Sequence, residues 1–141
     1  MEKYAVRMGG GENHRMNLKE MALIKDNHLA IIGSIRRAVE IVKAKTDKKV
    51  EVEVKSLEEV EEAVEAGPDR IMLDNMSLEE MRKAVEMIPP SIEVEASGNI
   101  TLEKISQIAG IGVQYISIGA LTHSAKALDM SLELELESKE G

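Results

Sequence analysis

The sequence predicts an α/β fold in which strands and helices alternate and the strands form a parallel sheet. Two observations support this prediction. Short apolar runs, most of them rich in β-branched residues, recur at intervals of about 20 to 29 residues along the chain of 141 residues. The segments between these runs carry apolar residues at helical spacing. Right-handed crossovers assemble repeated strand–helix–strand units of this kind into a parallel sheet.

The predicted strands are the apolar runs themselves. A sixth candidate, over residues 128–137, differs from the others because Met130, Leu132, Leu134 and Leu136 alternate strictly with polar residues. Such alternation is typical of a strand with one buried and one solvated face. The five earlier strands are predicted over 21–24, 50–54, 70–73, 92–94 and 115–118.

The helices are predicted from residues that begin and end them. Ser56 with Glu59, and Ser77 with Glu80, each match a capping box, in which a hydroxyl and a carboxylate accept hydrogen bonds from the first free backbone amides. Two further candidate N-caps lack the matching glutamate, namely Ser34 and Thr101. Residues suited to ending a helix follow the helical segments: Gly67, Gly110 and the pair Pro89 and Pro90.

Composition limits the function classes. The chain has 26 acidic and 18 basic residues, a formal net charge of -8, no cysteine, and only two aromatic residues, Tyr4 and Tyr115. Nucleic-acid binding is disfavoured because both phosphate neutralisation and base stacking lack their groups. Disulfides, thiolate metal sites and cysteine nucleophiles are excluded. The length fits one domain, and the N-terminus lacks the apolar core of a signal peptide, so we expect a cytoplasmic protein.

Basic residues gather beside a glycine run, although the protein as a whole is acidic. Glycines occupy positions 9–11, His14 and Arg15 follow them, and Lys25 and His28 come about ten residues later. Backbone amides and cations placed together are typical of an anion site. A flexible loop with solvated charges is the alternative interpretation of this segment.

Polar residues also lie in or directly after every predicted strand of the first five. The carboxyl ends of parallel strands lie on one side of the sheet, where α/β folds bind ligands, so we expect a site there. Each of these residues also has an alternative, non-functional interpretation. Asp74 could cap a loop, Glu51 and Glu53 could face solvent on an edge strand, and His28 and His123 could be structural. The polar residues are Lys25, Asp26, Glu51, Glu53, Asp74, Asn75, Glu95, Ser97, Gly98, Asn99 and Gly119.

Six ordered blocks cover nearly the whole chain: GGGENHR at 9–15, IKDNH at 24–28, VEVEV at 50–54, MLDNM at 72–76, EASG at 95–98 and SIGALTH at 117–123. They resemble the blocks of quinolinate phosphoribosyltransferase, also called carboxylating nicotinate-nucleotide pyrophosphorylase. The resemblance implies a partial parallel α/β barrel, TIM-like, with five to six strands. It also implies phosphoribosyl transfer from phosphoribosyl pyrophosphate to quinolinate with decarboxylation, which gives nicotinate mononucleotide in NAD biosynthesis.

The resemblance further implies roles for particular residues. His14, Arg15 and Lys25 would bind quinolinate, whose carboxylates suit a planar guanidinium and fixed cations. Lys25, Glu53 and Asp74 would be catalytic, and the two carboxylates would also hold Mg²⁺, directly or through water. The 5′-phosphate would be held by turns rich in backbone amides, at Ser97, Gly98 and Gly119.

Two positions depart from the family pattern. Gln114 stands where an aspartate is common, and Asn99 stands where a glycine is common. Family members are also about twice as long, with a Thr-Arg-Lys-Thr stretch shortly before the part that matches Met1. We therefore expect residues 1–141 to be the C-terminal part of the barrel, with the N-terminal domain and the first part of the barrel absent.

This expectation leaves several alternatives open. The chain could be a truncated reading frame, an excised domain or one half of a split enzyme that works as a homodimer or with the missing N-terminal portion. It could instead be a non-catalytic fragment that retains a phosphate site. A homologue of the same fold associated with molybdate transport shares several blocks, although the pair His14 and Arg15 favours the quinolinate enzyme.

Overall fold

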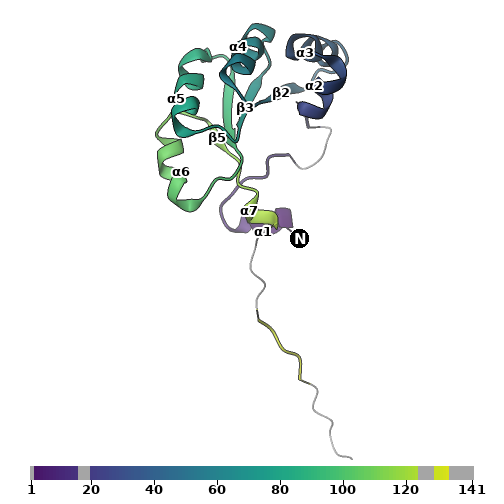
Figure 1. The fold of residues 1–141 in the computed structure, drawn as a ribbon. Helices are drawn as coiled ribbons and strands as arrows, with labels where there is room; N and C mark the ends of the chain where they lie inside the picture. The colour runs from purple at the N-terminus through teal and green to yellow at the C-terminus, as the bar shows by residue number, and fades with distance from the viewer. Residues whose placement is uncertain (1, 16–19, 124–128, 134–141) are drawn as a thin grey trace, which may run out of the picture.

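The computed structural model describes residues 2–15, 20–123 and 129–133, which contain one five-stranded parallel sheet. The strands follow one another in the order β1-β2-β3-β4-β5, so each new strand is added beside the previous one (Figure 1). Every crossover then runs over the same face of the sheet, as in an α/β barrel. The strands are β1 (Met21–Ile24), β2 (Lys49–Val54), β3 (Arg70–Asp74), β4 (Glu93–Ser97) and β5 (Tyr115–Ile116).

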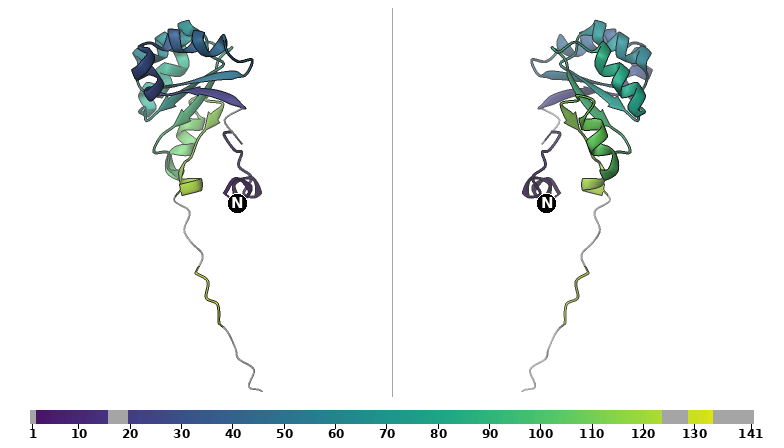
Figure 2. Two further views of the ribbon diagram at one scale, coloured as in Figure 1. Left: turned by 90° about the vertical axis from the view of Figure 1, so that its right-hand side faces the viewer. Right: turned by 90° about the vertical axis from the view of Figure 1, so that its left-hand side faces the viewer.

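The helices between the strands cover one face of the sheet, while α1 lies beside α7 near the end of β5 (Figures 1 and 2). Within the described ranges, no helix has the length and apolar character that a membrane span requires. The helices are α1 (Glu2–Met8), α2 (Asp26–Ile32), α3 (Ile35–Lys43), α4 (Leu57–Ala66), α5 (Leu78–Met87), α6 (Leu102–Ala109) and α7 (Ala120–His123).

The predicted helix starts are confirmed to different degrees. Ser77 and Glu80 form the complete capping box, with the Ser77 amide 2.8 Å from the Glu80 carboxylate. Ser56 accepts a hydrogen bond from the Glu59 amide, but the Glu59 carboxylate accepts from the Lys55 amide instead of closing the box. The box at Ser56 was therefore predicted only half correctly. Ser34 caps α3 through the Arg37 amide, whereas the Thr101 side chain makes no capping bond.

The predicted helix ends are also confirmed, with one difference in conformation. Gly67 ends α4 in the left-handed region at φ 65°, where glycine carries no steric penalty. Gly110 ends α6 at φ -68°, a right-handed conformation that any residue can adopt. Gly112 takes the left-handed conformation there, at φ 104°. Helix α5 stops at Met87, and its C-cap Ile88 directly precedes the proline pair at 89–90.

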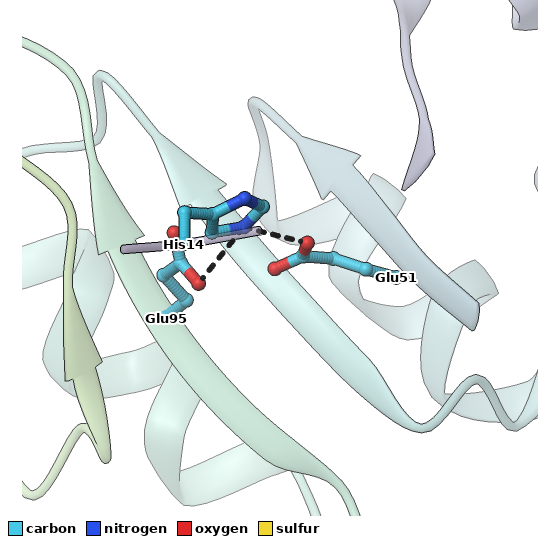
Figure 3. A group of neighbouring side chains, drawn as sticks. All are labelled: His14, Glu51 and Glu95. Carbon is cyan, nitrogen blue, oxygen red and sulfur yellow. Dashed lines mark hydrogen bonds and ion pairs between the residues drawn. The ribbon is translucent and has the colours of Figure 1, made fainter. Parts of the chain in front are cut away.

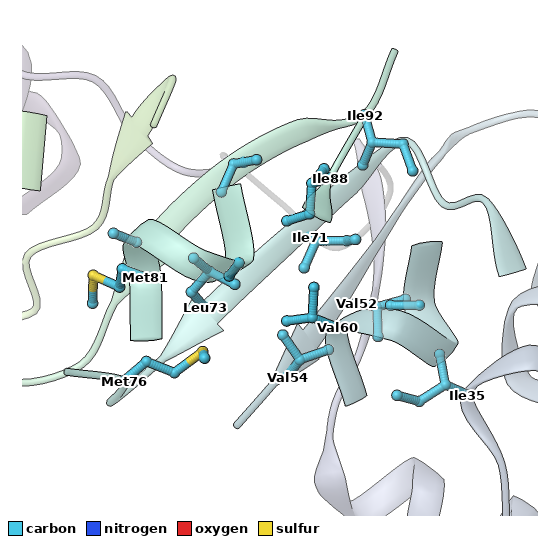
Figure 4. Close-up of a cluster of buried hydrophobic side chains, with 14 of the residues drawn as sticks. Ile35, Val52, Val54, Val60, Ile71, Leu73, Met76, Met81, Ile88 and Ile92 are labelled. Atoms are coloured by element: carbon cyan, nitrogen blue, oxygen red, sulfur yellow. The ribbon is translucent and has the colours of Figure 1, made fainter. Parts of the chain in front are cut away.

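The hydrophobic core lies between the sheet and its helices. Alternate side chains of β2 point into it, so Val50, Val52 and Val54 are fully buried, and Ile71 and Leu73 continue the layer on β3 (Figure 4). Burial of each such side chain contributes about 1.5 to 3 kcal/mol. The intervening residues of the same strands point to the opposite face, which is polar. The alternation in the sequence thus gives the sheet one apolar face, which packs against the helices, and one polar face.

Three predicted strands need correction. The strand predicted over 115–118 is observed only over Tyr115–Ile116. The strand predicted over 92–94 is observed over Glu93–Ser97, because Glu95 and Ser97 point to the polar face and interrupt the apolar run. The sixth strand, predicted over 128–137, is not observed at 129–133, where residues are exposed and have no regular secondary structure. Met130 and Leu132, which should have formed the buried face of this strand, are both exposed. Residue 128 and residues 134–137 lie outside the described residues.

Candidate active site

The polar face of the sheet carries charged side chains in rows across neighbouring strands. Glu51 of β2 lies opposite Arg70 of β3, which lies opposite Glu93 of β4. One step further along, Glu53, Met72 and Glu95 form the next row. Because parallel strands keep this register, residues separated by about 20 positions in sequence become neighbours on one surface.

His14 lies over this face between two carboxylates (Figure 3). Its Nε2 is 2.9 Å from Glu51 Oε2 and 3.4 Å from Glu95 Oε2. The hydrogen bond with Glu51, followed by the one with Glu95, raises the pKa of His14 from its ordinary value near 6.5 to about 9. The segment after the glycine run is therefore tied to the middle of the sheet by a protonated imidazole.

The two carboxylates of this cluster have different environments. Burial raises the pKa of Glu51, and the hydrogen bond from His14 offsets this only in part. Burial also acts to raise the pKa of Glu95, but hydrogen bonds from His14 and Ser117 outweigh it, so this pKa is lowered. Glu51 Oε1 is buried and has no hydrogen-bond partner among the residues that the structure describes.

Arg70 links the carboxylates of β4. Its Nη1 donates to Glu95 Oε2 at 3.1 Å, and its Nε and Nη2 donate to Glu93 Oε2 at 3.2 and 3.0 Å. The guanidinium carbon also lies 3.7 Å from the centre of the Tyr115 ring, which is a cation–π contact. Arg70 thus pairs with the buried Glu95 and the partly exposed Glu93, and it contacts an aromatic ring on β5.

A second charged cluster lies where β1, β2 and β3 end. Glu53 Oε2 is 3.9 Å from Lys25 Nζ, and Glu53 Oε1 is 3.9 Å from Lys55 Nζ. Burial raises the pKa of Glu53, and the negative charge of Asp74 adds to this effect. Lys55 also pairs with Asp26 at 2.7 Å. Glu53 and Asp74, with cations on either side, form a candidate binding site for a polar ligand or a metal ion.

A hollow of about 490 Å³ lies at the ends of β4 and β5. It brings together all three residues that were predicted to hold a phosphate, and the backbone amides of Gly98 and Gly119 donate no hydrogen bond within the described part of the chain. A methyl group on Gly119 would lie 2.7 Å from His123 Nε2. The lining residues with polar groups or glycine backbones are Ser97, Gly98, Asn99, Thr101, Ser117, Gly119 and His123.

The two departures from the family pattern have structural explanations. Asn99 adopts φ 48°, a left-handed conformation that asparagine tolerates better than most residues, so it can replace a glycine. Its side chain also donates to Asn75 Oδ1 at 2.9 Å. Gln114 accepts from the Val94 amide at 2.7 Å and donates to the Gly112 carbonyl at 3.0 Å, which secures the turn before β5.

Gly98 is expected to be sensitive to substitution for a steric reason. It has φ +85°, and an added Cβ would lie 2.4 Å from Asn75 Oδ1 and 2.7 Å from the Asn75 amide nitrogen. We expect Gly98→Ala to destabilise the fold by about 2 to 3 kcal/mol in urea unfolding, because backbone strain and a clash combine. Gly33→Ala is the matched control, since Gly33 has φ +89° with nothing within 4 Å of the added atom. If both variants lose the same unfolding free energy, the contact between the new methyl group and Asn75 costs nothing and the steric prediction is wrong.

The raised pKa of His14 predicts how stability depends on pH. A pKa raised in the folded state means that the His14 interaction stabilises fully below about pH 6.5 and is lost as the pH rises through about 9. Because the ring is partly solvent-exposed, we expect a loss of about 1 to 2 kcal/mol. The measurement is the difference between the unfolding free energies of the wild type and His14→Asn from pH 6 to 10. A difference that stays constant over this range would contradict the assignment.

The structure places the predicted site residues in separate groups. Lys25 lies with Glu53, and His14 lies with Glu51 and Glu95, as given above. Arg15 Nη1 instead donates to the carbonyl of Met21, at the start of β1, at 3.3 Å. The predicted quinolinate residues are therefore not gathered around one point. His28 has a structural role, because its Nδ1 accepts a hydrogen bond from the Lys25 amide at 3.0 Å.

Sequence reasoning missed four residues that contact the site. Lys55 and Arg70 continue the period-two pattern of β2 and β3 on the polar face, and that pattern could have identified them. Tyr115 on β5 reaches Arg70, and Ser117, directly after β5, continues the same alternation and reaches Glu95. Arg70, Tyr115 and Ser117 were treated as parts of apolar runs, and Lys55 lies just after one, so their orientation was not considered.

Comparisons with known proteins agree on one family. The family model described as quinolinate phosphoribosyl transferase, C-terminal domain, matches residues 1–133. A probable nicotinate-nucleotide pyrophosphorylase [carboxylating] of Bacillus subtilis is 45% identical over 141 residues, covering 99% of this chain and 49% of that protein. The chain spans about half the length of the curated relatives it matches.

Solved structures show the same relationship. A crystal structure of NadC from Streptococcus pyogenes superposes with a TM-score of 0.82 at 51% identity, covering 94% of this chain and 47% of that one. A NadC deletion mutant superposes with a TM-score of 0.84 at 52% identity, covering 91% and 46%. Both superpositions cover more than nine-tenths of this chain, so these proteins share its fold over that length.

Proposed function

The chain belongs to the quinolinate phosphoribosyl transferase family, as its C-terminal domain, and on that premise we propose that it carries part of the site for phosphoribosyl transfer to quinolinate. The observation that supports this proposal most is the pairing of Glu53 and Asp74 beside Lys25, next to the glycine-lined hollow at the ends of β4 and β5. A negative group, a cation and free backbone amides are the elements that a phosphorylated sugar donor and an anionic acceptor require.

The proposed reaction forms a bond between the quinolinate nitrogen and C1 of the phosphoribosyl group, while pyrophosphate leaves with the electrons of the broken C–O bond. Loss of one quinolinate carboxylate as carbon dioxide leaves an electron pair on the ring carbon, which takes up a proton and yields nicotinate mononucleotide. Positive charge develops at C1 as pyrophosphate departs. The carboxylates of Glu53 and Asp74 would stabilise that charge electrostatically, since fixed charge is most effective where charge develops.

Glu53 and Asp74 also suit Mg²⁺. Burial and the charge of Asp74 both raise the pKa of Glu53, and a hard cation that prefers carboxylate oxygen and water would relieve the repulsion between the two acids. Bound there, Mg²⁺ would neutralise part of the charge of the pyrophosphate. The chain's own contribution is to hold the two carboxylates in adjacent strands, with Lys25 and Lys55 at their edges.

We assign the 5′-phosphate to the hollow that contains Ser97, Gly98 and Gly119. Its backbone amides can donate to phosphate oxygens, and the Ser97 hydroxyl adds a further donor. Glycine is required at both positions for close packing, because an added Cβ would meet Asn75 at Gly98 and His123 at Gly119. Ser97 lies two residues after Glu95 on β4. This strand therefore contributes both to the His14 cluster and to the proposed phosphate site.

We further propose that residues 1–141 form the C-terminal part of a barrel. The relatives are about twice as long, and β1 and β5 are each paired on one side only within the described residues. Activity would then require the remaining portion as well. This portion would add groups that hold the acceptor.

Selective binding of a dicarboxylate tests the acceptor assignment. We expect quinolinate to bind at least tenfold more tightly than nicotinate in calorimetric titrations, because two cations can hold two carboxylates. Lys25→Ala should reduce this preference, whereas Lys43→Ala, on the outer helix α3, should not. Arg15→Ala decides whether Arg15 leaves the Met21 carbonyl to bind the ligand. Equal affinity for both compounds in the wild type would refute the assignment.

A further inference from the structure

We infer that His14, Glu51 and Glu95 form a site for a transition-metal ion of the Zn²⁺ type, separate from the proposed Mg²⁺ position at Glu53 and Asp74. The three side chains come from the segment before β1 and from strands β2 and β4, and they converge over the middle of the polar face (Figure 3). Their ligating atoms all lie within 4.8 Å of one another. The inference does not depend on the proposed transferase activity.

The spacing of these atoms matches that of ligands around one ion. Two ligand atoms about 2.1 Å from a metal, at angles of about 90 to 109°, lie about 3.0 to 3.4 Å apart. His14 Nε2 lies 2.9 Å from Glu51 Oε2 and 3.4 Å from Glu95 Oε2. A divalent ion can thus replace the proton that His14 otherwise shares with the two acids, with small side-chain movements.

A buried carboxylate oxygen provides an independent reason to expect a ligand. Glu51 is fully buried, and its Oε1 has no hydrogen-bond partner among the described residues. An uncompensated buried carboxylate oxygen is costly, so it calls for a proton or a cation. Figure 3 shows the Glu51 carboxylate facing the His14 ring and Glu95, which places this oxygen at the edge of the proposed site.

The surroundings of the cluster suit a metal site. Ser117 and Arg70 both donate to the Glu95 carboxylate, which orients it as hydrogen-bonding partners orient metal ligands. A cavity of about 420 Å³, lined in part by His14, Glu95 and Tyr115, gives access from solvent. Three protein ligands leave at least one coordination position for water or a small anion.

The donor set selects the kind of ion. An imidazole nitrogen suits Zn²⁺, Co²⁺ and Ni²⁺, whereas Mg²⁺ and Ca²⁺ prefer oxygen ligands only. The sequence has no cysteine, so thiolate-dependent sites are excluded. Glu53 and Asp74 offer oxygen alone. Excess Mg²⁺ should therefore occupy those carboxylates without displacing Zn²⁺ from His14.

Calorimetric titration of Zn²⁺ into the tag-free chain at pH 8, in excess Mg²⁺, tests the inference. We expect one saturable site, and each of His14→Asn, Glu51→Gln and Glu95→Gln should weaken binding at least tenfold. The matched control replaces both other histidines, His28→Asn and His123→Asn, and should bind as the wild type does. Absence of saturable binding, or loss of binding in the control alone, would overturn the inference.

Spectroscopy of the wild type keeps the test decisive if a cluster variant fails to fold. X-ray absorption of the chain loaded with one equivalent of Co²⁺ should show scattering from one imidazole together with oxygen ligands. Scattering from oxygen alone would mean that exposed carboxylates take the ion, and it would refute the site. Circular dichroism of each variant shows whether its loss of binding reflects the ligand or the fold.

Discussion

Arg70→Met is expected to destabilise the fold by about 3 to 5 kcal/mol, the largest effect that we predict for a single side chain. The substitution preserves much of the apolar stem but removes the cation that serves both Glu93 and Glu95. Glu95 is almost completely buried, so without Arg70 the His14 imidazolium has to compensate the charges of both Glu51 and Glu95 in a place that water cannot reach. The Tyr115 ring also loses its cation–π contact. Urea unfolding at pH 7 measures the effect.

The double variant Arg70→Met with Glu95→Gln separates the charge effect from packing. If the cost comes from the unpaired carboxylate, neutralising Glu95 should restore at least half of the lost stability. If the double variant is no more stable than Arg70→Met, packing of the Arg70 stem against Tyr115 explains the loss, and the electrostatic account of the polar face is wrong. Lys83→Met, which removes an exposed pair with Glu79, should cost less than about 0.5 kcal/mol.

Asp74→Asn is expected to lower the rate of phosphoribosyl transfer about 100-fold in an active assembly that contains this chain. The amide keeps the size of the side chain but removes the negative charge proposed to stabilise the developing positive charge at C1. The charge of Asp74 also raises the pKa of Glu53, so the substitution should leave Glu53 ionised at lower pH. The measurement is the rate of nicotinate mononucleotide formation at saturating substrates and Mg²⁺.

The control for this prediction is an acid of the outer surface. Glu79→Gln, on α5 and exposed, should leave the rate unchanged. Similar rates for Asp74→Asn and the wild type would show that Asp74 caps the loop after β3, as its hydrogen bond from Asn75 allows, and does not take part in the chemistry.

Features that depend on nearby residues were predicted well from the sequence. β1 was predicted over its observed bounds, because its four apolar residues are flanked on both sides by charged residues that mark the ends of the strand. The capping box of Ser77 and Glu80 was also correct, since it requires only two residues of one helical turn. The box at Ser56 was half wrong because the neighbouring Lys55 amide competes for the Glu59 carboxylate.

Contacts between distant segments were harder to predict. His14 and Glu51 are 37 positions apart, and their hydrogen bond depends on how the segment before β1 crosses the sheet. The local sequence pattern does not distinguish a histidine that hydrogen-bonds two buried acids from one that binds a substrate. The same limit applies to Arg15, which was expected near Lys25 and contacts the opposite end of β1. The residues proposed to bind the phosphate were easier to group, because strand order alone brings Ser97, Gly98 and Gly119 together.

The most direct test of the proposed function mixes this chain with a separately produced N-terminal half of the Bacillus subtilis relative. Quinolinate, phosphoribosyl pyrophosphate and Mg²⁺ are added, and products are quantified by mass spectrometry after native mass spectrometry has shown that the two chains associate. The account predicts nicotinate mononucleotide and pyrophosphate in equal amounts, with neither formed when this chain is omitted. An associated complex that forms no nicotinate mononucleotide would contradict it.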